Sequence, residues 1–588
     1  MKEFLKYTLA TITGIIIASF LFFFILMGSL AALVASGDKP VSISENSILV
    51  LKTGIPIPDR TSQSPLAGFD IINMEISSSP GLNEILKNIR KASQDDKIKG
   101  ILIENGLLSS GWATTEEIRN ALIKFRESGK FVISYTDYAL TQECYYLSTA
   151  ADKVYVNPGA MIDFKGLSSE VMFFKDALEK IGVEVQVTRH GKFKGAVEPF
   201  ILDKLSEENK TQIKAYAGSI WDHVVKNISS ARNIPAEKLN QIADNLDATV
   251  ASGALNVGLI DGLIYRDVLT DTLKSLTGIK SSEDLKTVSM TKYSKVPEKK
   301  KSPAKSKISI IYAEGNIVTG NGNESNIGGN KFAGVIRKER EDSTVKAIVL
   351  RVNSPGGNAV ASDIMWRELQ LAAMVKPVIV SMGNYAASGG YYISAPATKI
   401  YANPTTISGS IGVFGLLPNM NRLMEDKLGL KTEVVRTNTN SDFPSVFRPL
   451  NSREKEVMLM SVEQVYGNFV GKVAAGRKME PDRVDSIGQG RVWSGSNALS
   501  IGLVDEIGGL ETAIDGAAEL AGIKDYSIRE LPEIEDPYVK LLGQLSGEVR
   551  AAFIKNELGE NVRYYNMLRE IGEMKGIQAR LPFFMDIH

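Results

Sequence analysis

The stretch Tyr-Tyr-Ile-Ser-Ala-Pro-Ala-Thr-Lys-Ile-Tyr-Ala-Asn-Pro, residues 391–404, occurs twice in this chain in closely similar form. The earlier copy, residues 145–158, is Tyr-Tyr-Leu-Ser-Thr-Ala-Ala-Asp-Lys-Val-Tyr-Val-Asn-Pro. The match extends to residues 254–261 and 498–505, near the ends of the two copies. A repeat of this size indicates two duplicated domains rather than a solenoid, whose periods are about 20–50 residues.

The two copies differ at two positions that could carry chemistry. Ser388 stands among small residues just before the later stretch, whereas Gln142 occupies the corresponding position in the earlier copy. Conversely, Lys194 of the earlier copy corresponds to Ser441 of the later one. A serine lost from one copy and a lysine lost from the other predict a single site assembled from both.

Composition excludes several classes of function. A chain of 588 residues exceeds the size at which one core keeps growing, so at least two domains are expected. The 68 basic residues cancel the 68 acidic ones, which argues against a nucleic-acid surface. The single cysteine, Cys144, excludes an intramolecular disulfide framework, and a total of three histidines argues against a histidine-rich metal site. No cofactor is expected.

The N-terminal segment predicts a membrane anchor. Lys2 and Lys6 precede an uncharged run, residues 7–37, and about 20 apolar residues suffice to cross a bilayer. The lysines favour a cytoplasmic N-terminus, a single pass through the inner membrane, and a periplasmic remainder. Signal-peptide cores are usually shorter, about 7–15 residues, although Ala35-Ser36-Gly37 would permit processing.

Apolar patterning predicts two series of alternating strands and helices. Each series begins with a short apolar strand, and the order of elements is the same in both. Such alternation favours parallel βαβ units. Strands are expected at 47–51, 98–103, 131–133, 308–312, 345–352 and 377–381, and helices at 82–92, 206–231, 363–373 and 452–475, with an N-cap signature at Thr114-Thr115-Glu116-Glu117.

The expected domain organisation has five parts. A basic, proline-containing stretch between the copies is expected to be a surface linker. The parts are an anchor at 1–37, a first repeat at 38–287, the linker at 288–306, a second repeat at 307–525, and a helical extension at 526–588 in which 538–553 has helical spacing.

Ser388 is the strongest candidate nucleophile. It follows an apolar strand and begins an apolar helix, although an N-cap serine would have the same local sequence. A serine needs a base, and a lysine can serve if burial lowers its pKa from about 10.4. The apolar sequence after Lys194 favours that residue mildly, while Lys192 and His190 remain alternatives.

Gly356 and Gly357 follow a predicted strand and could leave backbone N–H groups pointing into a cleft. Such donors stabilise the oxyanion of an acyl-transfer transition state. The earlier copy has Ser109-Ser110 at this place. A plain Gly-Gly turn is the alternative.

In combination, these segments resemble the signal peptide peptidase A family of serine peptidases, in its long, duplicated, membrane-anchored form. The resemblance implies two tandem Clp protease-like and crotonase-like βαβ superhelical domains, with Ser388 as nucleophile and Lys194, rather than Lys192, as base. It also implies an oxyanion hole near Gly356 and Gly357, and a hydrogen bond from Ser410 to the lysine amine. The motifs are Asn353-Ser354-Pro355-Gly356-Gly357, Ala386-Ala387-Ser388-Gly389-Gly390-Tyr391, Lys194-Gly195-Ala196-Val197-Glu198-Pro199-Phe200 and Ser408-Gly409-Ser410-Ile411-Gly412.

The resemblance further implies a homotetramer on the lipid bilayer that degrades remnant signal peptides and other hydrophobic peptides. His190 departs from the family pattern. Two other hypotheses are a crotonase-like coenzyme A enzyme and a non-catalytic membrane scaffold. An exported catalytic part argues against the first, because coenzyme A is intracellular. The complementary losses argue against the second, because the union of the two copies retains both groups.

Overall fold

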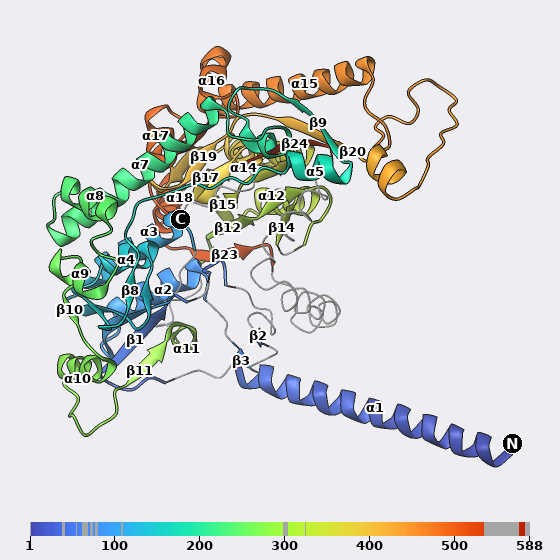
Figure 1. Cartoon of the computed structure of the whole chain (residues 1–588). Helices are drawn as coiled ribbons and strands as arrows, with labels where there is room; N and C mark the ends of the chain where they lie inside the picture. Colours follow the sequence, from blue (N-terminus) through green and yellow to red (C-terminus); the bar gives the residue numbers. More distant parts are fainter. Residues whose placement is uncertain are drawn as a thin grey trace.

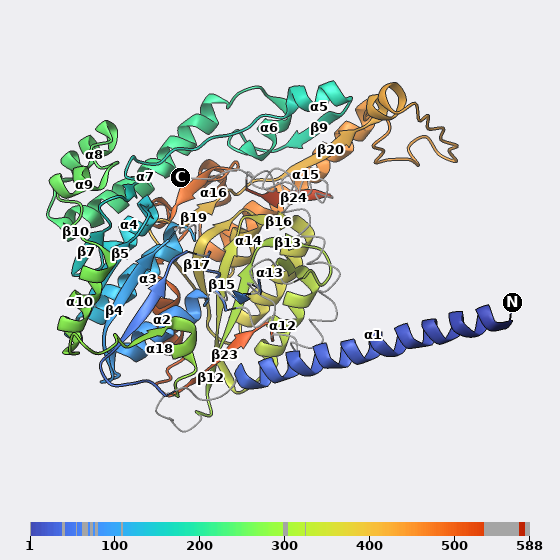
Figure 2. The ribbon, with the colours of Figure 1, turned by 60° about the horizontal axis from the view of Figure 1, so that its bottom comes forward.

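Two α/β domains lie against each other, and the long helix α1 (Lys2–Gly37) projects away from both (Figure 1). The computed structural model describes residues 2–37, 42–54, 56–61, 69–70, 75–76, 80–106, 110–297, 304–323, 325–533 and 576–581. The N-terminal domain contains the earlier sequence copy and the C-terminal domain contains the later one. The turned view shows their sheets side by side, each flanked by helices (Figure 2).

The N-terminal domain is built on a parallel sheet of order β10-β7-β5-β4-β1-β11. On one face Leu49 packs with apolar residues of α2 and α3, and on the other Ile48 packs with Leu269 and Leu273 of α10. Burial on both faces explains the continuous apolar runs of these strands. The strands are β1 (Ser47–Lys52), β4 (Ile98–Asn105), β5 (Phe131–Thr136), β7 (Lys153–Val156), β10 (Gly262–Leu263) and β11 (Thr287–Ser289).

Several helices of this domain cover the two faces of this sheet, and two pairs of short strands lie outside it. The helices are α2 (Leu82–Ser93), α3 (Trp112–Arg126), α4 (Gln142–Ser148), α5 (Lys175–Ile181), α6 (Glu198–Ile201), α7 (Glu207–Arg232), α8 (Ala236–Asn245), α9 (Ala251–Asn256), α10 (Arg266–Thr277) and α11 (Met290–Ser294). The short strands are β2 (Phe69–Asp70) with β3 (Glu75–Ile76), and β6 (Ala139–Leu140) with β8 (Met161–Ile162).

The C-terminal domain repeats this topology strand for strand. Its strands run in the order β22-β18-β17-β15-β12-β23 and are parallel, and β19 and β21 extend the sheet beyond β17. The predicted duplication is therefore confirmed. The strands are β12 (Lys307–Glu314), β15 (Val345–Ser354), β17 (Val378–Ala387), β18 (Lys399–Ala402), β19 (Ile407–Gly409), β21 (Val492–Ser494), β22 (Glu506–Ile507) and β23 (Ser527–Leu531).

The helices of the C-terminal domain match the predicted pattern. The segments expected at 363–373 and 452–475 form α13 and α15, with ends that differ by a few residues. The helices are α12 (Gly329–Glu341), α13 (Ala359–Ala373), α14 (Gly389–Ser394), α15 (Ser452–Arg477), α16 (Pro481–Ile487), α17 (Gly495–Ser500) and α18 (Leu510–Leu520).

A third, mixed sheet joins the two domains and has the order β14-β13-β16-β24-β20-β9. Strand β9 of the N-terminal domain pairs antiparallel with β20 of the C-terminal domain over its whole length. This pairing carries the chain of the first domain onto the second just before Lys194. The strands are β9 (Glu184–Arg189), β13 (Asn316–Val318), β14 (Asn326–Gly328), β16 (Gly356–Asn358), β20 (Phe414–Asn419) and β24 (Ile577–Arg580).

Two expected domain boundaries are shifted by strand pairing. The linker expected at 288–306 begins inside the N-terminal domain, because β11 pairs with β1 and Tyr293 of α11 is buried in the core. The described parts of the extension, 526–533 and 576–581, form strands. β23 pairs with the otherwise free edge of β12, and β24 lies in the third sheet. Residues 538–553, for which a helix was predicted, lie outside the described residues.

The start of α3 differs from the predicted N-cap. The helix begins at Trp112, and its N-cap residue, Gly111, has no side chain to offer. Asn384 of the C-terminal domain acts instead, since its Oδ1 accepts hydrogen bonds from the backbone N–H groups of Ala113 and Thr114 at 3.1 Å each. A tertiary cap therefore replaces the local one predicted from Thr114–Glu117.

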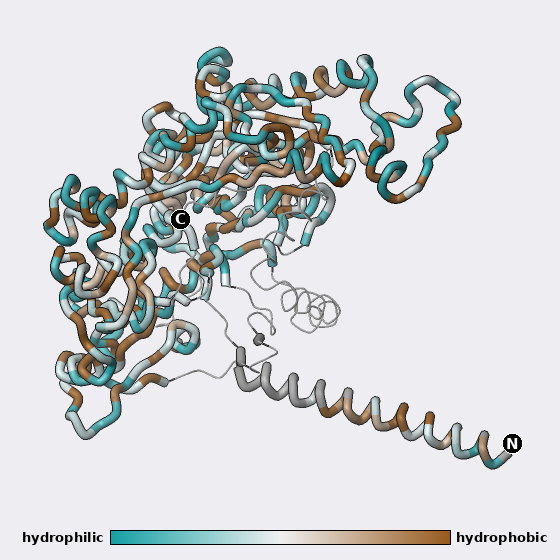
Figure 3. The backbone as a smooth tube through the Cα atoms, in the orientation of Figure 1, coloured by the Kyte–Doolittle hydropathy of each residue, from teal (hydrophilic) through white to brown (hydrophobic). Residues whose placement is uncertain are grey.

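Much of the coloured part of helix α1 is hydrophobic (Figure 3), and its described apolar side chains are exposed. Phe4, Phe22 and Phe24 are 74%, 68% and 67% exposed. Among the residues that the structure describes, no helix combines the length and the hydropathy needed to cross a membrane.

Candidate active site

Ser388 lies between the end of β17 and the first turn of α14, as predicted. It has φ 53° and ψ −113°, a backbone conformation that non-glycine residues rarely adopt. Such a conformation costs about 1–3 kcal/mol and persists only where the surroundings enforce it. Here the Ser388 N–H donates to the carbonyl of Gly409 and its carbonyl accepts from the Tyr392 N–H, both at 2.8 Å. The backbone is thereby fixed with the side chain fully buried.

The hydroxyl of Ser388 does not cap the helix. No hydrogen bond joins it to the N–H groups of α14. Instead its Oγ lies 2.9 Å from the amine of Lys194 and 3.4 Å from the carbonyl oxygen of Gly412. The alternative of an N-cap serine therefore does not describe this structure.

Lys194 reaches Ser388 from the other domain and is fully buried. Its stem lies in a slot between two glycines. A β-carbon on Gly490 would lie 2.7 Å from Cβ of Lys194, and one on Gly412 would lie 3.2 Å from its Cδ. Burial lowers the pKa of Lys194 well below its ordinary value of 10.5, because the apolar slot disfavours the charged form.

Ser410 completes the surroundings of the lysine amine. Its hydroxyl oxygen lies 3.0 Å from Nζ and its carbonyl oxygen lies 3.2 Å away. A neutral amine has two N–H groups and one lone pair. The two oxygens of Ser410 can accept both N–H groups, which leaves the lone pair for the hydroxyl of Ser388. The arrangement thus satisfies a neutral lysine in full.

Two side chains that the sequence did not single out hold the lysine segment in place. Gln212 of α7 donates to the carbonyl of Phe193 at 2.9 Å and accepts from the N–H of Val492 at 3.0 Å. Arg189 donates to the carbonyl of Lys194 at 3.3 Å and lies 3.6 Å from the buried carboxylate of Glu198. The contact of Gln212 with Val492 links the lysine segment to the other domain, so no local pattern could have indicated it.

Gly356 and Gly357 lie beside the serine. Gly356 has φ 101°, and a β-carbon on it would lie 2.7 Å from the nitrogen of Gly389, the residue after Ser388. A β-carbon on Gly357 would lie 2.1 Å from the carbonyl oxygen of Ile317, so no larger residue fits. The N–H of Gly356 donates to the Ser354 hydroxyl at 3.1 Å. Gly389 was not assigned to the oxyanion hole from the sequence, although its nitrogen borders the same space.

The two alternative bases lie elsewhere. Lys192 is exposed to solvent. The ring of His190 stacks on Tyr466, with ring centroids 3.7 Å apart, and its Nδ1 lies 2.8 Å from the carboxylate of Glu463 on α15. Neither of these two contacts connects His190 to Ser388.

Gln142 corresponds to Ser388 in the earlier copy, and Ser441 corresponds to Lys194 in the later copy. Both make hydrogen bonds to nearby backbone groups. The Oε1 of Gln142 accepts from the N–H groups of Lys165 and Gly166, each at 2.9 Å. Ser441 is exposed and donates to the carbonyl of Asn438 at 3.0 Å. Ser109 lies outside the described residues.

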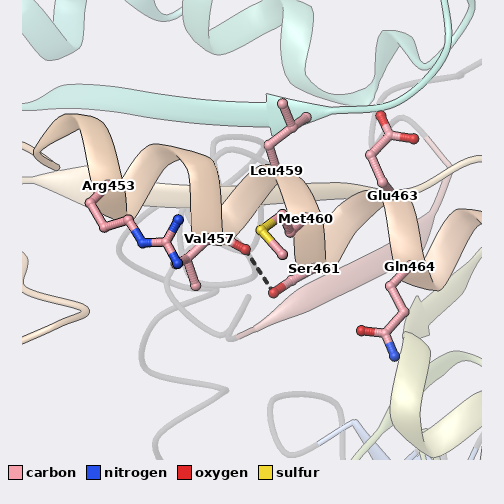
Figure 4. Close-up of a pocket in the computed structure, with 7 residues that line it drawn as sticks. All are labelled: Arg453, Val457, Leu459, Met460, Ser461, Glu463 and Gln464. Atoms are coloured by element: carbon pink, nitrogen blue, oxygen red, sulfur yellow. Dashed lines mark hydrogen bonds between the residues drawn. The ribbon is translucent and has the colours of Figure 1, made fainter.

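A surface hollow along α15 is separate from this site (Figure 4). It includes a serine, but the Ser461 hydroxyl donates to the carbonyl of Val457 at 2.9 Å within the same helix. No base is associated with that hydroxyl among the lining residues. They are Arg453, Val457, Leu459, Met460, Ser461, Glu463 and Gln464.

Comparison with protein families defines the class of this duplicated α/β fold as a serine peptidase. The model of peptidase family S49 matches residues 124–280 and 370–524, one segment in each half of the chain. The chain belongs to peptidase family S49, the family that includes signal peptide peptidase A. This assignment replaces the alternative of a coenzyme A enzyme.

Similar proteins come from bacteria and a plant. The chain is 32% identical to Protease 4 of Haemophilus influenzae over 529 residues, which cover 87% of this chain and 86% of that protein. It is 33% identical to the chloroplastic serine protease SPPA of Arabidopsis thaliana, over 88% of this chain and 76% of that protein. A solved structure of a mutant ClpP1 from Listeria monocytogenes aligns at 14% identity and a TM-score of 0.23, covering 35% of this chain and 94% of that one.

Proposed function

We propose that this protein is a membrane-anchored serine endopeptidase that cleaves hydrophobic peptides, including remnant signal peptides, through a Ser388–Lys194 dyad. The single observation that carries the proposal is the 2.9 Å contact between the Lys194 amine and the Ser388 hydroxyl, both fully buried and contributed by different domains. Membership of family S49 supports the reaction class.

In the proposed mechanism the neutral amine of Lys194 accepts the proton of the Ser388 hydroxyl as Oγ attacks the peptide carbonyl. The resulting lysine ammonium then donates a proton to the leaving amine, and an acyl-enzyme remains on Ser388. Water hydrolyses this ester with the lysine again acting as base. Ser410 acts by orienting the amine, since both of its oxygens lie within hydrogen-bonding distance of Nζ.

The oxyanion formed during the attack needs backbone donors beside Ser388. Gly356, Gly357 and Gly389 border that place, and the absence of side chains lets a substrate carbonyl approach. Because the N–H of Gly356 donates to Ser354 in this structure, we assign the N–H of Gly389 as a further donor. Removing one such donor typically lowers the rate by about 10²–10³-fold.

The proposal includes membrane attachment through the N-terminal segment. Residues 7–37 are uncharged, and the described apolar side chains of α1 are exposed. Exposed apolar surface on a helix that projects from the domains favours lipid contact. We place the protein in the inner membrane as a single-pass homotetramer, with the catalytic part on the periplasmic side. The name of the Enterococcus faecium relative contains the words signal peptide peptidase, which supports the substrate.

The dyad is tested with a serine-directed acylating probe on the full chain in detergent. Wild-type protein should be labelled and Ser388→Ala should not. Lys194→Ala should lose labelling and lower the rate of peptide hydrolysis by about 10²–10⁴-fold, the usual contribution of general acid–base catalysis. Lys192→Ala, a matched lysine variant two residues away, should behave as wild type.

Full activity in Lys194→Ala would rule out the dyad. A wild-type protein that neither reacts with the probe nor cleaves peptides would favour the non-catalytic scaffold. For the anchor, a chain lacking residues 1–37 should move from the membrane fraction to the soluble fraction. Retention in the membrane would contradict the assigned anchor while leaving the dyad untouched.

A further inference from the structure

The loop between α16 and β21 supports the lysine segment and Ser410 at the same time. The carbonyl of Gln489 accepts a hydrogen bond from the N–H of Phe193 at 3.1 Å, and the carbonyl of Arg491 accepts one from the N–H of Ser410 at 2.7 Å. Phe193 precedes Lys194 in the N-terminal domain, whereas Ser410 belongs to the C-terminal domain. The loop therefore links the backbone that carries Lys194 to the backbone that carries Ser410.

The backbone of this loop is strained where it meets the lysine. Gln489 has φ 53° and Ser410 has φ 49°, values that residues other than glycine rarely adopt. Between Gln489 and Arg491, Gly490 has φ 82°, and a β-carbon on it would lie 2.7 Å from the nitrogen of Lys194. Strained conformations persist only where the surroundings enforce them. The loop therefore needs contacts that keep it closed on the lysine segment.

The side chain of Arg491 supplies such a contact. Its guanidinium lies over the ring of Trp493, 4.2 Å from the ring centroid, and over the ring of Phe193 at 5.2 Å. A cation within about 6 Å of an aromatic face is attracted to it. The indole N–H of Trp493 donates to the carbonyl of Ile487 at 3.0 Å, which fixes that ring on the C-terminal domain. The guanidinium thus contacts one aromatic ring from each domain.

The two rings are the contacts that hold this guanidinium. Arg491 is half-buried, and among the described residues its side chain has no ion pair with a carboxylate. The charge of Arg491 is therefore left to interact with the two aromatic faces. Arg483, on the neighbouring helix α16, is exposed and offers a comparison.

We propose that Arg491 is a positioning residue for Lys194. Its guanidinium holds Phe193 against Trp493, and Lys194 is the next residue along the chain. Its carbonyl holds Ser410, which supplies two of the oxygens around the lysine amine. This inference rests on the proposed function and adds a residue on which the reaction depends. Arg491 acts through its neighbours rather than by touching the reacting atoms.

A small displacement of Lys194 should be costly. Its amine lies 2.9 Å from the Ser388 hydroxyl, and a misplacement of about 1 Å can lower a rate by about 10²-fold. A loosened slot should also admit water, and the pKa of Lys194 should then rise towards its ordinary value, because burial is what lowers it. Loss of the contact should therefore slow acylation and move its pH dependence to higher pH.

The test uses the full chain in detergent, a fluorogenic hydrophobic peptide and the serine-directed acylating probe. In Arg491→Met, which removes the cation and keeps a flexible stem, kcat should fall about 10–100-fold with KM little changed. The rising limb of kcat against pH should move to higher pH. Arg491→Lys, which keeps a cation, should recover part of the rate. Arg483→Met should behave as wild type.

Probe labelling separates a positioning role from a loss of fold. If Arg491 positions the lysine, the labelling rate of Arg491→Met falls while the final labelled fraction stays that of the wild type. Partial unfolding would instead lower the labelled fraction at an unchanged rate, and that result would overturn the proposal. A wild-type labelling rate and pH profile in Arg491→Met would overturn it as well.

A second variant keeps the charge and does not depend on the first. Phe193→Leu removes the ring of the N-terminal domain and should reproduce the slower labelling and the shifted pH dependence. Adding Arg491→Met to it should change little further, because both variants remove the same contact. A wild-type labelling rate in Phe193→Leu, or additive effects of the two changes, would overturn the proposal.

Ser388→Ala separates the two claims. If it retains hydrolysis, the proposed function fails. If it is inactive while Arg491→Met keeps the wild-type rate, only the positioning role fails.

Discussion

The amine of Lys194 is kept neutral by its burial rather than by the number of its hydrogen-bond partners. Two oxygens of Ser410 and one hydroxyl of Ser388 surround it within 3.2 Å, and burial lowers its pKa. A charged ammonium in the same slot would keep three N–H donors but lose its hydration. The buried amine is therefore in the form that could accept a proton from the Ser388 hydroxyl.

The lowered pKa of Lys194 predicts how the stability of the fold changes with pH. Because the folded-state pKa of Lys194 is lowered, the unfolded chain binds a proton that the folded chain lacks at every pH between that lowered pKa and about 10.4. The stability contributed by this residue therefore rises with pH across that window. Lys194→Met, of similar length and without charge, should melt at a higher temperature than wild type at pH 7.

The difference in melting temperature between Lys194→Met and wild type should narrow as the pH approaches 10, as measured by calorimetry. An unchanged difference from pH 6 to pH 10 would contradict a lowered pKa. In the wild-type enzyme kcat/KM should rise with pH and reach its plateau well below pH 10.5, since only the neutral amine accepts the serine proton.

A second residue-scale prediction concerns Ser410. Ser410→Ala removes the hydroxyl that accepts from Lys194 at 3.0 Å but keeps the carbonyl. A single hydrogen bond contributes about 0.5–1.5 kcal/mol, so kcat should fall by about 2–10-fold. The rising limb of the pH profile should also shift. Ser408→Ala, whose hydroxyl donates to the carbonyl of Ala386, is the matched buried control and should leave that profile unchanged.

At the scale of single elements, α3 depends on the other domain for its N-cap. Asn384 accepts from two N–H groups of the first turn and donates from Nδ2 to the carbonyl of Ser110 at 2.8 Å. The sequence suggested a cap from Thr114 or Thr115 because it shows only near neighbours. Both threonines are buried within the helix instead.

Replacing the cap should therefore destabilise both domains together. Asn384→Ala is expected to lower the free energy of unfolding by about 1–2 kcal/mol, the usual cost of losing an N-cap. Asn245→Ala, at the exposed end of α8, is the control and should change it little. Chemical denaturation followed by circular dichroism measures both. A loss in Asn384→Ala no larger than in the control would contradict the interdomain cap.

At the scale of the whole molecule, a buried charge cluster joins the two domains. Arg351 of β15 is fully buried and donates to Asp59 at 2.8 Å and to Glu117 of α3 at 2.8 Å. Glu117 also accepts from the N–H of Leu510 at 2.7 Å. The sequence placed Glu117 in a helix N-terminus. Both of its partners, Arg351 and the N–H of Leu510, belong to the C-terminal domain, so Glu117 links the two domains.

Removing one partner of a buried ion pair leaves an uncompensated charge. Arg351→Met should lower the free energy of unfolding by about 3–5 kcal/mol. It should also weaken activity, because Ser388 and Lys194 come from the two domains that this cluster joins. Arg453→Met, which breaks the exposed pair with Glu456, should cost less than about 1 kcal/mol. Equal effects of the two variants in urea denaturation would contradict the role of the cluster.

The strand and helix pattern was largely predictable because parallel strands buried on both faces leave long apolar runs. The residues at which the strands end were less predictable from the sequence. β17 continues past the expected Ser381 to Ala387, since pairing with β19 extends it next to the nucleophile. Strand alternation could not separate Lys192 from Lys194. Burial separates them, because the glycine slot that encloses Lys194 is built by residues 412 and 490 of the other domain.

The sequence by itself determined the duplication, the serine and the lysine that each copy has kept, and the glycines beside the serine, because these are local patterns of residue type and spacing. Only the tertiary structure decided that the two groups meet at 2.9 Å, that His190 faces Glu463 instead, and that the last described strand passes between β16 and β20. The physical reason is the separation in sequence between the residues that determine each property. Periodicity follows from neighbours in the chain, whereas a lowered lysine pKa and a filled strand position follow from contacts between segments hundreds of residues apart.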